Sequence, residues 1–259
     1  MKKILIPVLI VLFTILSVAE EPLPIQPVTL KKPNRDTLSY SNYSFDNGTS
    51  YRIIENLFKT KINSEQSFML DITLYKFVTL EKNLYTVGFF QDSDDYYYNL
   101  SYGYGAYSDN TSSGHLSAEV GWDTGEFMFG SLLRYNSYPG AYTIGSLTPY
   151  LEYELSDETS LLAQLSADLD NQNQNALSYY FMAEHELLTD FYIRGAYSLG
   201  SYIKQLTNTS FVKQDFNSWL LGFNWLVTDE LSIKYYYEYI NDINSTTGTG
   251  HTVAIRYRL

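Results

Sequence analysis

Charged side chains recur at alternate positions of several strand-like segments, a spacing that places them on one face of a sheet. Acids and bases on neighbouring strands can pair across the ladder and form a structural network. The same charges could instead line a water-filled lumen and bias ion selectivity. The spacing leaves both interpretations open. The residues on the expected lumen-lining face are Asp71, Glu119, Arg134, Glu152, Glu154, Asp168, Glu184, Arg194, Lys234, Glu238, Arg256 and Arg258.

Within this set, Lys234 and Glu238 lie on one expected strand and Arg256 lies on the next. Charges of opposite sign on adjacent strands attract each other across the ladder. We therefore predict an ion-pair cluster of these three side chains.

Three histidines, His115, His185 and His251, are candidate bases for nucleophilic catalysis. Lipid-acting hydrolases of barrel type need a serine and a histidine supported by an acid or an amide. No His-x-Ser-Asn run occurs, and no histidine stands beside an obvious pair of serine and acid. We predict a protein that is not an enzyme, with His115 and His251 as polar rim residues at the outer ends of strands.

Acidic residues close together in sequence are the remaining candidates for ligand binding. The group around Asp92 and Asp95 lies in an expected turn and lacks the glycine and distal glutamate of an EF-hand loop. Asp168 and Asp170 share a face at the outer end of their strand, where they could bind cations of lipopolysaccharide. The chain has no cysteine. We expect no metal centre and no cofactor.

The elements that position these residues are strands with a period of two. In the tyrosine-rich stretch 96–105, Tyr96, Tyr98, Leu100, Tyr102 and Tyr104 take one parity, and asparagine, serine and glycine take the other. A disordered tract has no reason to sort its residues by parity. The clearest further segments are 115–122, 160–170, 217–227, 231–240 and 251–259.

Short turns alternate with longer polar connections, as they do in outer-membrane barrels. The longer connections are expected at 108–114, 171–175, 205–215 and 241–250. We predict an all-β, transmembrane, antiparallel up-and-down β-barrel of 14 strands, with 12 as the fallback. A secreted β-sandwich is the alternative, but its strands average only ~5–6 residues. Pro149 lacks a backbone donor and predicts a bulge in segment 142–155.

The N-terminus predicts export. Residues 1–19 carry two lysines, an apolar run and Ser17-Val18-Ala19, which favours a cleaved signal peptide over an uncleaved anchor. Residues 20–37 form an expected extended periplasmic leader, and residues 38–259 form the barrel. Loss of Lys2 and Lys3 changes the net charge from −12 to −14, so nucleic acid is an unsuitable partner.

Aromatic residues near strand ends predict girdles at the two membrane interfaces; they are Trp122, Tyr135, Tyr153, Trp219 and Tyr239. The last segment, HTVAIRYRL, ends the chain with Val253, Ile255, Tyr257 and Leu259 on one parity. It resembles the C-terminal signal that the barrel assembly machinery reads during insertion, although that signal usually ends in an aromatic residue.

The region after the signal peptide resembles outer-membrane barrels of the YaiO type. The resemblance lies in the short leader, the strand YYYNLSYGYGAYSD, the tyrosine-rich hairpins and the closing HTVAIRYRL. It implies a location in the bacterial outer membrane, among its lipid and lipopolysaccharide, and for some relatives a link to surface polysaccharide export. No catalytic residues of that family map onto this chain.

We therefore expect a non-enzymatic outer-membrane barrel that passes small solutes or accompanies export of an envelope polymer. A closed-lumen barrel with a structural or surface-interaction role is the alternative, and a lipid-acting hydrolase is a weaker one. The sequence leaves the oligomeric state open.

Overall fold

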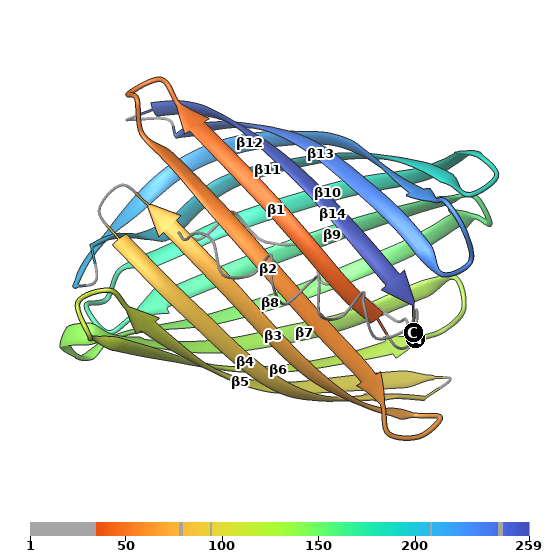
Figure 1. Cartoon of the computed structure of the whole chain (residues 1–259), viewed down its shortest axis with the longest axis horizontal. Coiled ribbons are helices and arrows are strands. Elements are labelled where there is room, and N and C mark those ends of the chain that lie inside the picture. The colour runs from red at the N-terminus through yellow and green to blue at the C-terminus, as the bar shows by residue number, and fades with distance from the viewer. Residues whose placement is uncertain (1–34, 78–79, 94, 208, 243–245, 259) are drawn as a thin grey trace, which may run out of the picture.

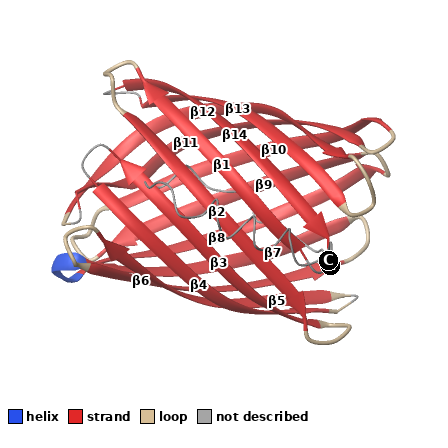
Figure 2. Ribbon diagram, in the orientation of Figure 1, coloured by secondary structure: helices blue, strands red, loops and turns tan. Residues whose placement is uncertain are grey.

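The structure is a computed structural model in which residues 35–77, 80–93, 95–207, 209–242 and 246–258 are described. The expected signal peptide, the leader up to residue 34, and Leu259 lie outside the described residues. Fourteen antiparallel strands close into one barrel, with each strand beside its neighbours in the chain and β1 beside β14 (Figure 1, Figure 2). The predicted fourteen-stranded barrel is confirmed, and the twelve-stranded fallback is wrong.

The strands are β1 (Arg35–Phe45), β2 (Ser50–Lys61), β3 (Gln66–Phe77), β4 (Leu80–Asp92), β5 (Tyr96–Tyr107), β6 (Ser112–Asp123), β7 (Phe127–Tyr138), β8 (Tyr142–Ser156), β9 (Thr159–Asp170), β10 (Asn175–Leu188), β11 (Phe191–Thr207), β12 (Ser210–Leu226), β13 (Leu231–Asp242) and β14 (Thr246–Arg258). A 3-10 turn, η1 (Pro139–Ala141), joins β7 to β8. Among the described residues, no helix is long and apolar enough to cross a membrane. β1 begins at Arg35, so three residues assigned to the leader belong to the barrel wall.

The first and last strands close the barrel. β1 pairs with β14 from Arg35 opposite Arg258 to Phe45 opposite Gly248. We call the end that holds Arg35 and Arg258 the proximal end and the other the distal end. Just beyond the distal end of this seam, the Thr247 hydroxyl and backbone N–H donate to the Asp46 carboxylate at 2.8 and 3.2 Å. A closed sheet leaves no strand edge unpaired.

The connections at the distal end are shorter than expected. β6 already begins at Ser112 and β12 at Ser210, inside segments that we expected to be loops. Pairing satisfies backbone groups whatever the side chains, so the ladder continues through Ser, Thr and Asn. Asx turns then reverse the chain within a few residues: Asp109 Oδ1 accepts from the Thr111 backbone N–H at 3.0 Å and from its hydroxyl at 2.6 Å. The predicted longer connections at 108–114, 205–215 and 241–250 are therefore wrong in length, whereas the one at 171–175 lies almost as predicted, between Asp170 and Asn175.

Pro149 produces no bulge, contrary to the prediction. Its partner on β7 is Ser131, and the register between β8 and β9 is the same on both sides of it, from Leu147 opposite Ala167 to Tyr150 opposite Gln164. The ring removes a single donor, and the flanking pairs keep the ladder aligned. The register of β8 shifts instead between Glu154 and Ser156.

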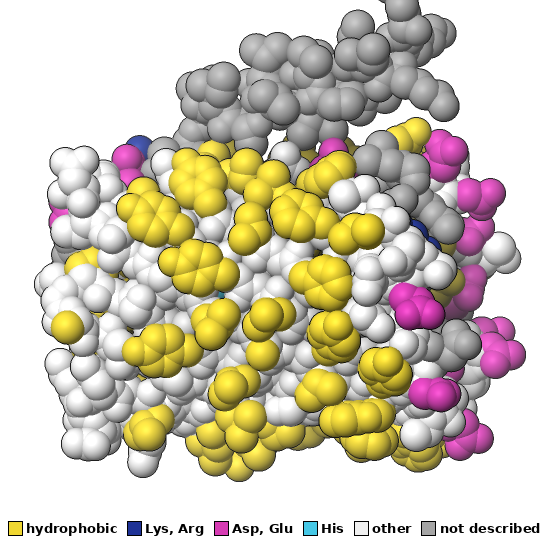
Figure 3. All heavy atoms as spheres, turned by 90° about the horizontal axis from the view of Figure 1, so that it is seen from below, with side chains coloured by type: hydrophobic (Ala, Val, Ile, Leu, Met, Phe, Trp, Pro, Cys, Tyr) yellow, Lys and Arg dark blue, Asp and Glu magenta, His cyan; other side chains and the backbone are white. Residues whose placement is uncertain are grey.

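The outer face of the wall is apolar, and acidic side chains gather at one end. Figure 3 shows hydrophobic side chains spread over the barrel wall and a group of acidic ones at its right-hand, proximal end. The exposed carboxylates in or beside the proximal turns are Glu65, Asp95, Glu126, Asp157, Glu158, Asp190, Asp229 and Glu230. A wall of this kind suits a hydrocarbon layer with charges left outside it.

The expected girdle residues lie on the outer face. Trp122 stacks on Phe129, with ring centroids 5.7 Å apart, near the proximal end. Tyr153 stacks on Phe127 at 4.6 Å, at the same end. Toward the distal end, Trp219 stacks on Tyr239, which is three residues from the end of β13. Tyr135 lies three residues from the distal end of β7. The expected belts thus have members near both ends of the wall.

The tryptophans give the first prediction. The chain has three tryptophans, Trp122, Trp219 and Trp225. They lie on the lipid-facing side, and 45, 38 and 47% of their surface is exposed, respectively. We expect phospholipids with brominated acyl chains to quench the intrinsic fluorescence of the reconstituted protein strongly, and aqueous iodide to quench it weakly. Efficient quenching by iodide in folded protein would show that this face meets water.

Candidate functional site in the lumen

The inward face of the barrel carries most of the polar and charged side chains named from the sequence. Asp71 and Arg134 line a cavity in the lumen. Glu119 is almost fully buried and accepts a hydrogen bond from the Tyr97 hydroxyl at 2.9 Å. Arg134 interacts electrostatically with Glu119 and with Asp168. The side chain of Arg258 lies outside the described residues.

A second group of predicted lumen residues lies around Arg194. Its guanidinium bonds the Glu184 carboxylate through Nε at 2.9 Å and Nη2 at 2.6 Å. Arg194 also lies over the ring of Tyr236, with its guanidinium carbon 5.6 Å from the centroid. Arg256 and Glu152 are electrostatic neighbours of this pair. The printed distances thus join β11 to Glu184 of β10 and to the Tyr236 ring of β13.

The predicted cluster of Lys234, Glu238 and Arg256 is wrong. Arg256 is opposite Ser232 on β13, and Glu238 is six residues further along that strand. At ~3.3 Å per residue the two rungs are ~20 Å apart. Glu238 instead accepts from the Tyr43 hydroxyl at 3.0 Å, across β14. The sequence showed which face these residues share but not their distances along the strands.

The Arg194–Glu184 pair carries the second prediction. Both side chains are largely buried, so removal of one partner leaves an uncompensated charge. We expect Glu184→Ala to lower the free energy of unfolding by about 3 kcal/mol. The measurement is the urea dependence of the folded band in a gel where folded and heat-unfolded forms migrate differently.

Glu81→Ala is the matched control for this prediction. It breaks the pair between Glu81 and Lys76, whose side chains are 40 and 51% exposed. An exposed pair contributes about 0–1 kcal/mol. Equal effects of the two variants would contradict a buried ionic network in the lumen.

An aromatic cluster lies inside the barrel toward the proximal end. It consists of buried side chains from β4, β5, β8, β9 and β10: Phe90, Tyr97, Tyr150, Leu162, Tyr180 and Met182. Tyr97 lies at its centre and has no exposed surface; its hydroxyl contacts that of Tyr150. We call this set the proximal plug. Tyr97 and Tyr150 lie against Gly121 of β6 and Gly130 of β7, where an added methyl group would overlap them, so this set narrows the lumen at this height.

A second closure lies at the distal end, where the β11–β12 hairpin crosses the lumen. Phe211 on β12 stacks on Tyr142 of β8, with ring centroids 3.7 Å apart. Gln205 on β11 contacts the Tyr107 hydroxyl of β5 through its amide nitrogen at 3.1 Å. The hairpin therefore contacts strands three to six positions away around the barrel. We call these contacts the distal lid.

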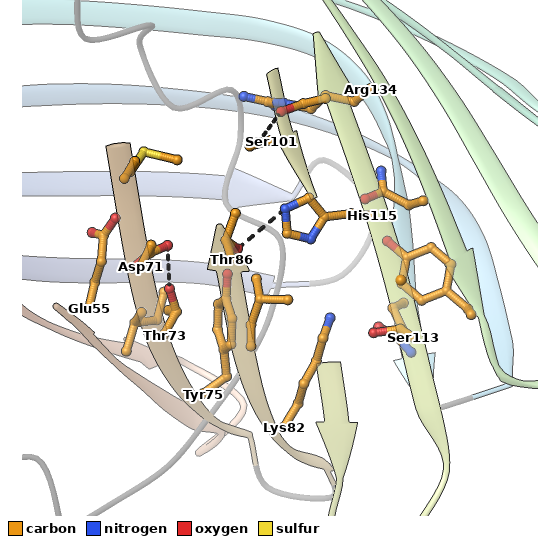
Figure 4. Close-up of a pocket in the computed structure, with 18 residues that line it drawn as sticks. Glu55, Asp71, Thr73, Tyr75, Lys82, Thr86, Ser101, Ser113, His115 and Arg134 are labelled. Atoms are coloured by element: carbon orange, nitrogen blue, oxygen red, sulfur yellow. Dashed lines mark hydrogen bonds between the residues drawn. The ribbon is translucent and has the colours of Figure 1, made fainter. Parts of the chain in front are cut away.

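The lumen retains a cavity of about 380 Å³ on the side of β2–β7 (Figure 4). Glu55 and Asp71 lie on one side, whereas His115 and Arg134 lie on the other. Gln205 of the distal lid also lines it. Pockets for small ligands typically have volumes of ~300–1,000 Å³. The space fits a small solute.

The structure places the three histidines in three different environments. His115 points into the cavity and lies 3.4 Å from the Thr86 hydroxyl. His251 is on the outer face, where its Nδ1 bonds the Tyr235 hydroxyl at 2.8 Å. His185 bonds the hydroxyl of Thr159 at 2.9 Å. The rim assignment of His115 is wrong because β6 begins earlier than expected and carries it into the wall.

Asp170 faces the lumen and is not available to surface cations. Its carboxylate accepts backbone N–H groups of Gln172 and Gln174 at 2.9 and 2.7 Å and a hydrogen bond from Tyr142. The side chain is only 5% exposed. The expected binding of lipopolysaccharide cations by Asp168 and Asp170 is therefore wrong in the case of Asp170.

Sequence reasoning missed Glu55, Lys82 and Thr73 of the cavity. They lie on β2, β4 and β3, in the part of the chain where alternation is weakest. Glu55 is opposite Thr73 in the β2–β3 ladder, so the two side chains share the inward face. The sequence does not give this register.

No family model and no curated protein matches the sequence. Among solved structures, the chain is similar to the CymD monoaromatic hydrocarbon channel, at 9% identity and a TM-score of 0.66, over 89% of each chain. It is also similar to the P. putida toluene transporter TodX, at 9% identity and a TM-score of 0.61, over 89% of this chain and 91% of that one. It is similar as well to an anion-selective porin from Comamonas acidovorans, at 8% identity and a TM-score of 0.50, over 87% of this chain and 98% of that one.

At these identities the similarity shows the fold alone. The chain has the fold of a bacterial outer-membrane β-barrel.

Proposed function

We propose that this protein is a non-enzymatic barrel of the bacterial outer membrane that passes small polar solutes through its lumen. The observation that supports this proposal is the charged cavity between the distal lid and the proximal plug. A purely structural lumen has no need of unfilled space lined by charges of both signs. Several barrels of similar fold are channels or porins by name.

The structure corresponds to a closed state in this proposal. Passage requires movement at the distal lid, where Gln205 and Tyr107 meet, and at the proximal plug. Both obstructions consist of side chains and one hairpin tip, so the strands of the wall can stay paired while a solute passes. The proximal end, with its acidic turns, faces the periplasm in this arrangement.

The proposal also implies how the barrel is inserted into the membrane and which molecules surround it there. Val253 and Ile255 lie on the lipid face of β14, beside β1, as a C-terminal insertion signal requires. Tyr257 donates to the exposed Glu230 at 3.0 Å. We propose recognition of this strand by the barrel assembly machinery, contact of the wall with lipid and lipopolysaccharide, and membership of the YaiO-type family. A role beside an envelope polymer exporter fits the same location.

The second candidate is a closed-lumen structural barrel. The proximal plug and the distal lid favour it, because together they narrow the lumen at two heights. The two candidates differ in whether the obstructions open.

Single-channel recording in a planar bilayer distinguishes them. For a channel we expect brief conductance steps in the unmodified protein and longer openings in Gln205→Ala, which removes the bridge to Tyr107. Gln172→Ala, in the exposed β9–β10 turn, is the control and should behave as the unmodified protein does. Silent bilayers with both the unmodified protein and Gln205→Ala, shown to be folded, would refute passage and leave the structural barrel.

A further inference from the structure

The cavity carries opposite charges on opposite walls, and this arrangement points to the class of solute. Glu55 of β2 and Asp71 of β3 lie together on one wall. His115 of β6 and Arg134 of β7 lie across the cavity from them (Figure 4). Within the described part of the chain, no ion pair joins the two walls. The charges are therefore held apart by the space between them.

The acidic wall lacks a cation. The Glu55 carboxylate accepts from the Ser39 hydroxyl at 3.0 Å, and one Asp71 oxygen accepts from Thr73 at 3.1 Å. The other Asp71 oxygen, Oδ1, is buried and has no hydrogen-bond partner. The two carboxyl groups also interact electrostatically with each other. A buried acceptor without a donor is costly, and an ammonium group supplies up to three donors.

On the opposite wall, Arg134 has no carboxylate partner among the described residues that line the cavity. Arg134 interacts electrostatically with Glu119, Asp168 and Tyr75; Tyr75 lines the cavity, whereas the two carboxylates do not. His115 lies within electrostatic range of both Arg134 and Lys82, so two cations and an imidazole converge here. Guanidinium groups bind carboxylates with two parallel hydrogen bonds. An anion in the cavity would therefore meet an arginine already oriented by the carboxylates behind it.

We infer that this cavity binds small dipolar solutes, whose ammonium group meets Glu55 and Asp71 and whose carboxylate meets Arg134 and His115. Amino acids of low molecular mass have this chemistry, and the 380 Å³ of space suits their size. The inference rests on the proposed function, since it names the class of solute that the channel admits. A solute with a single charge satisfies only one wall.

Ligand-observed NMR titration of the folded protein in detergent tests the inference, with 4-aminobutyrate, butyrate and butylamine as probes. We expect 4-aminobutyrate to bind at least about tenfold more tightly than either single-charge probe. Asp71→Asn combined with Glu55→Gln should weaken 4-aminobutyrate binding about tenfold and leave butyrate unchanged. Arg134→Gln should remove the advantage over butylamine instead.

Asp157→Asn, in an exposed proximal turn, is the control for a general loss of negative charge. Equal binding of all three probes, or no binding by folded protein, overturns the inference. So does an Asp157→Asn effect as large as that of the cavity variants. Binding of 4-aminobutyrate without any conductance supports the binding site but refutes passage of solutes. Conductance without preferential binding of 4-aminobutyrate supports passage but refutes the binding site.

Discussion

Gly200→Ala is expected to abolish most of the folded barrel, because this glycine allows β11 to change direction. Its φ of +131° lies in the region that residues with a side chain rarely adopt. A methyl group there would lie 2.3 Å from the Leu177 carbonyl oxygen and 2.6 Å from Ser178 Cα. Both atoms are backbone, so no side-chain movement relieves the overlap. We expect a loss of about 3 kcal/mol or more in the free energy of unfolding.

The change of direction at Gly200 also forms the distal lid. Ser198 and Ser201 both face inward, although strict alternation would put them on opposite faces. Pairing of β11 with β10 ends at Ser178 opposite Gly200, and the Ser201 hydroxyl accepts the Leu177 N–H at 3.2 Å in place of a ladder bond. Beyond this point β11 pairs with β12 alone, and their hairpin reaches across the lumen.

The effect of Gly200→Ala is measured as the yield of folded protein after refolding. This yield is read from the gel band whose mobility changes when the sample is heated. Gly145→Ala is the matched control, since its nearest neighbour to an added methyl is the Leu169 carbonyl oxygen at 3.9 Å, an ordinary contact. A folded yield of Gly200→Ala equal to that of Gly145→Ala would mean that the bend needs no glycine.

The sequence predicts the wall of this barrel better than its contents, and β5 shows why. Lipid selects every second residue of Tyr96–Tyr107 for an apolar side chain, so the strand and its outer face can be recognised without knowledge of its neighbours. Small inward residues such as Ser101 and Gly103 then follow by parity. The predicted number of strands rests on the same alternation of apolar and small or polar residues.

The lumen could not be predicted in this way because its contacts depend on the register and on opposite walls. Gln205 and Tyr107 are 98 residues apart in sequence and meet only because the barrel closes. Parity alone also failed beyond Gly200, where the inward face of β11 changes. The pairing of Glu238 with Tyr43 instead of Arg256 has the same origin, since distance along the strand depends on register.

Removal of the Tyr97 ring is expected to open the lumen at the proximal plug. The side chain is fully buried at the centre of the plug, stacks on Phe90 with centroids 5.7 Å apart, and bonds Glu119. The ring lies against Gly121 of β6 and meets the Tyr150 hydroxyl of β8, so it occupies space on the lumen side of the wall. We expect Tyr97→Ala to raise single-channel conductance several-fold over the unmodified protein.

Two further variants separate the effect of the Tyr97 ring from the effect of its hydroxyl and from that of a tyrosine on the lipid face. Tyr97→Phe keeps the ring and removes only the hydroxyl, so its conductance should stay close to that of the unmodified protein. Tyr98→Ala removes a tyrosine from the lipid face of the same strand and should leave conductance unchanged. Truncating a buried aromatic residue costs about 3–5 kcal/mol, so each variant must first show the heat-shifted band of a folded barrel. If folded Tyr97→Ala conducts no better than Tyr98→Ala, the narrowest point lies elsewhere, and the distal lid becomes the main barrier to solutes.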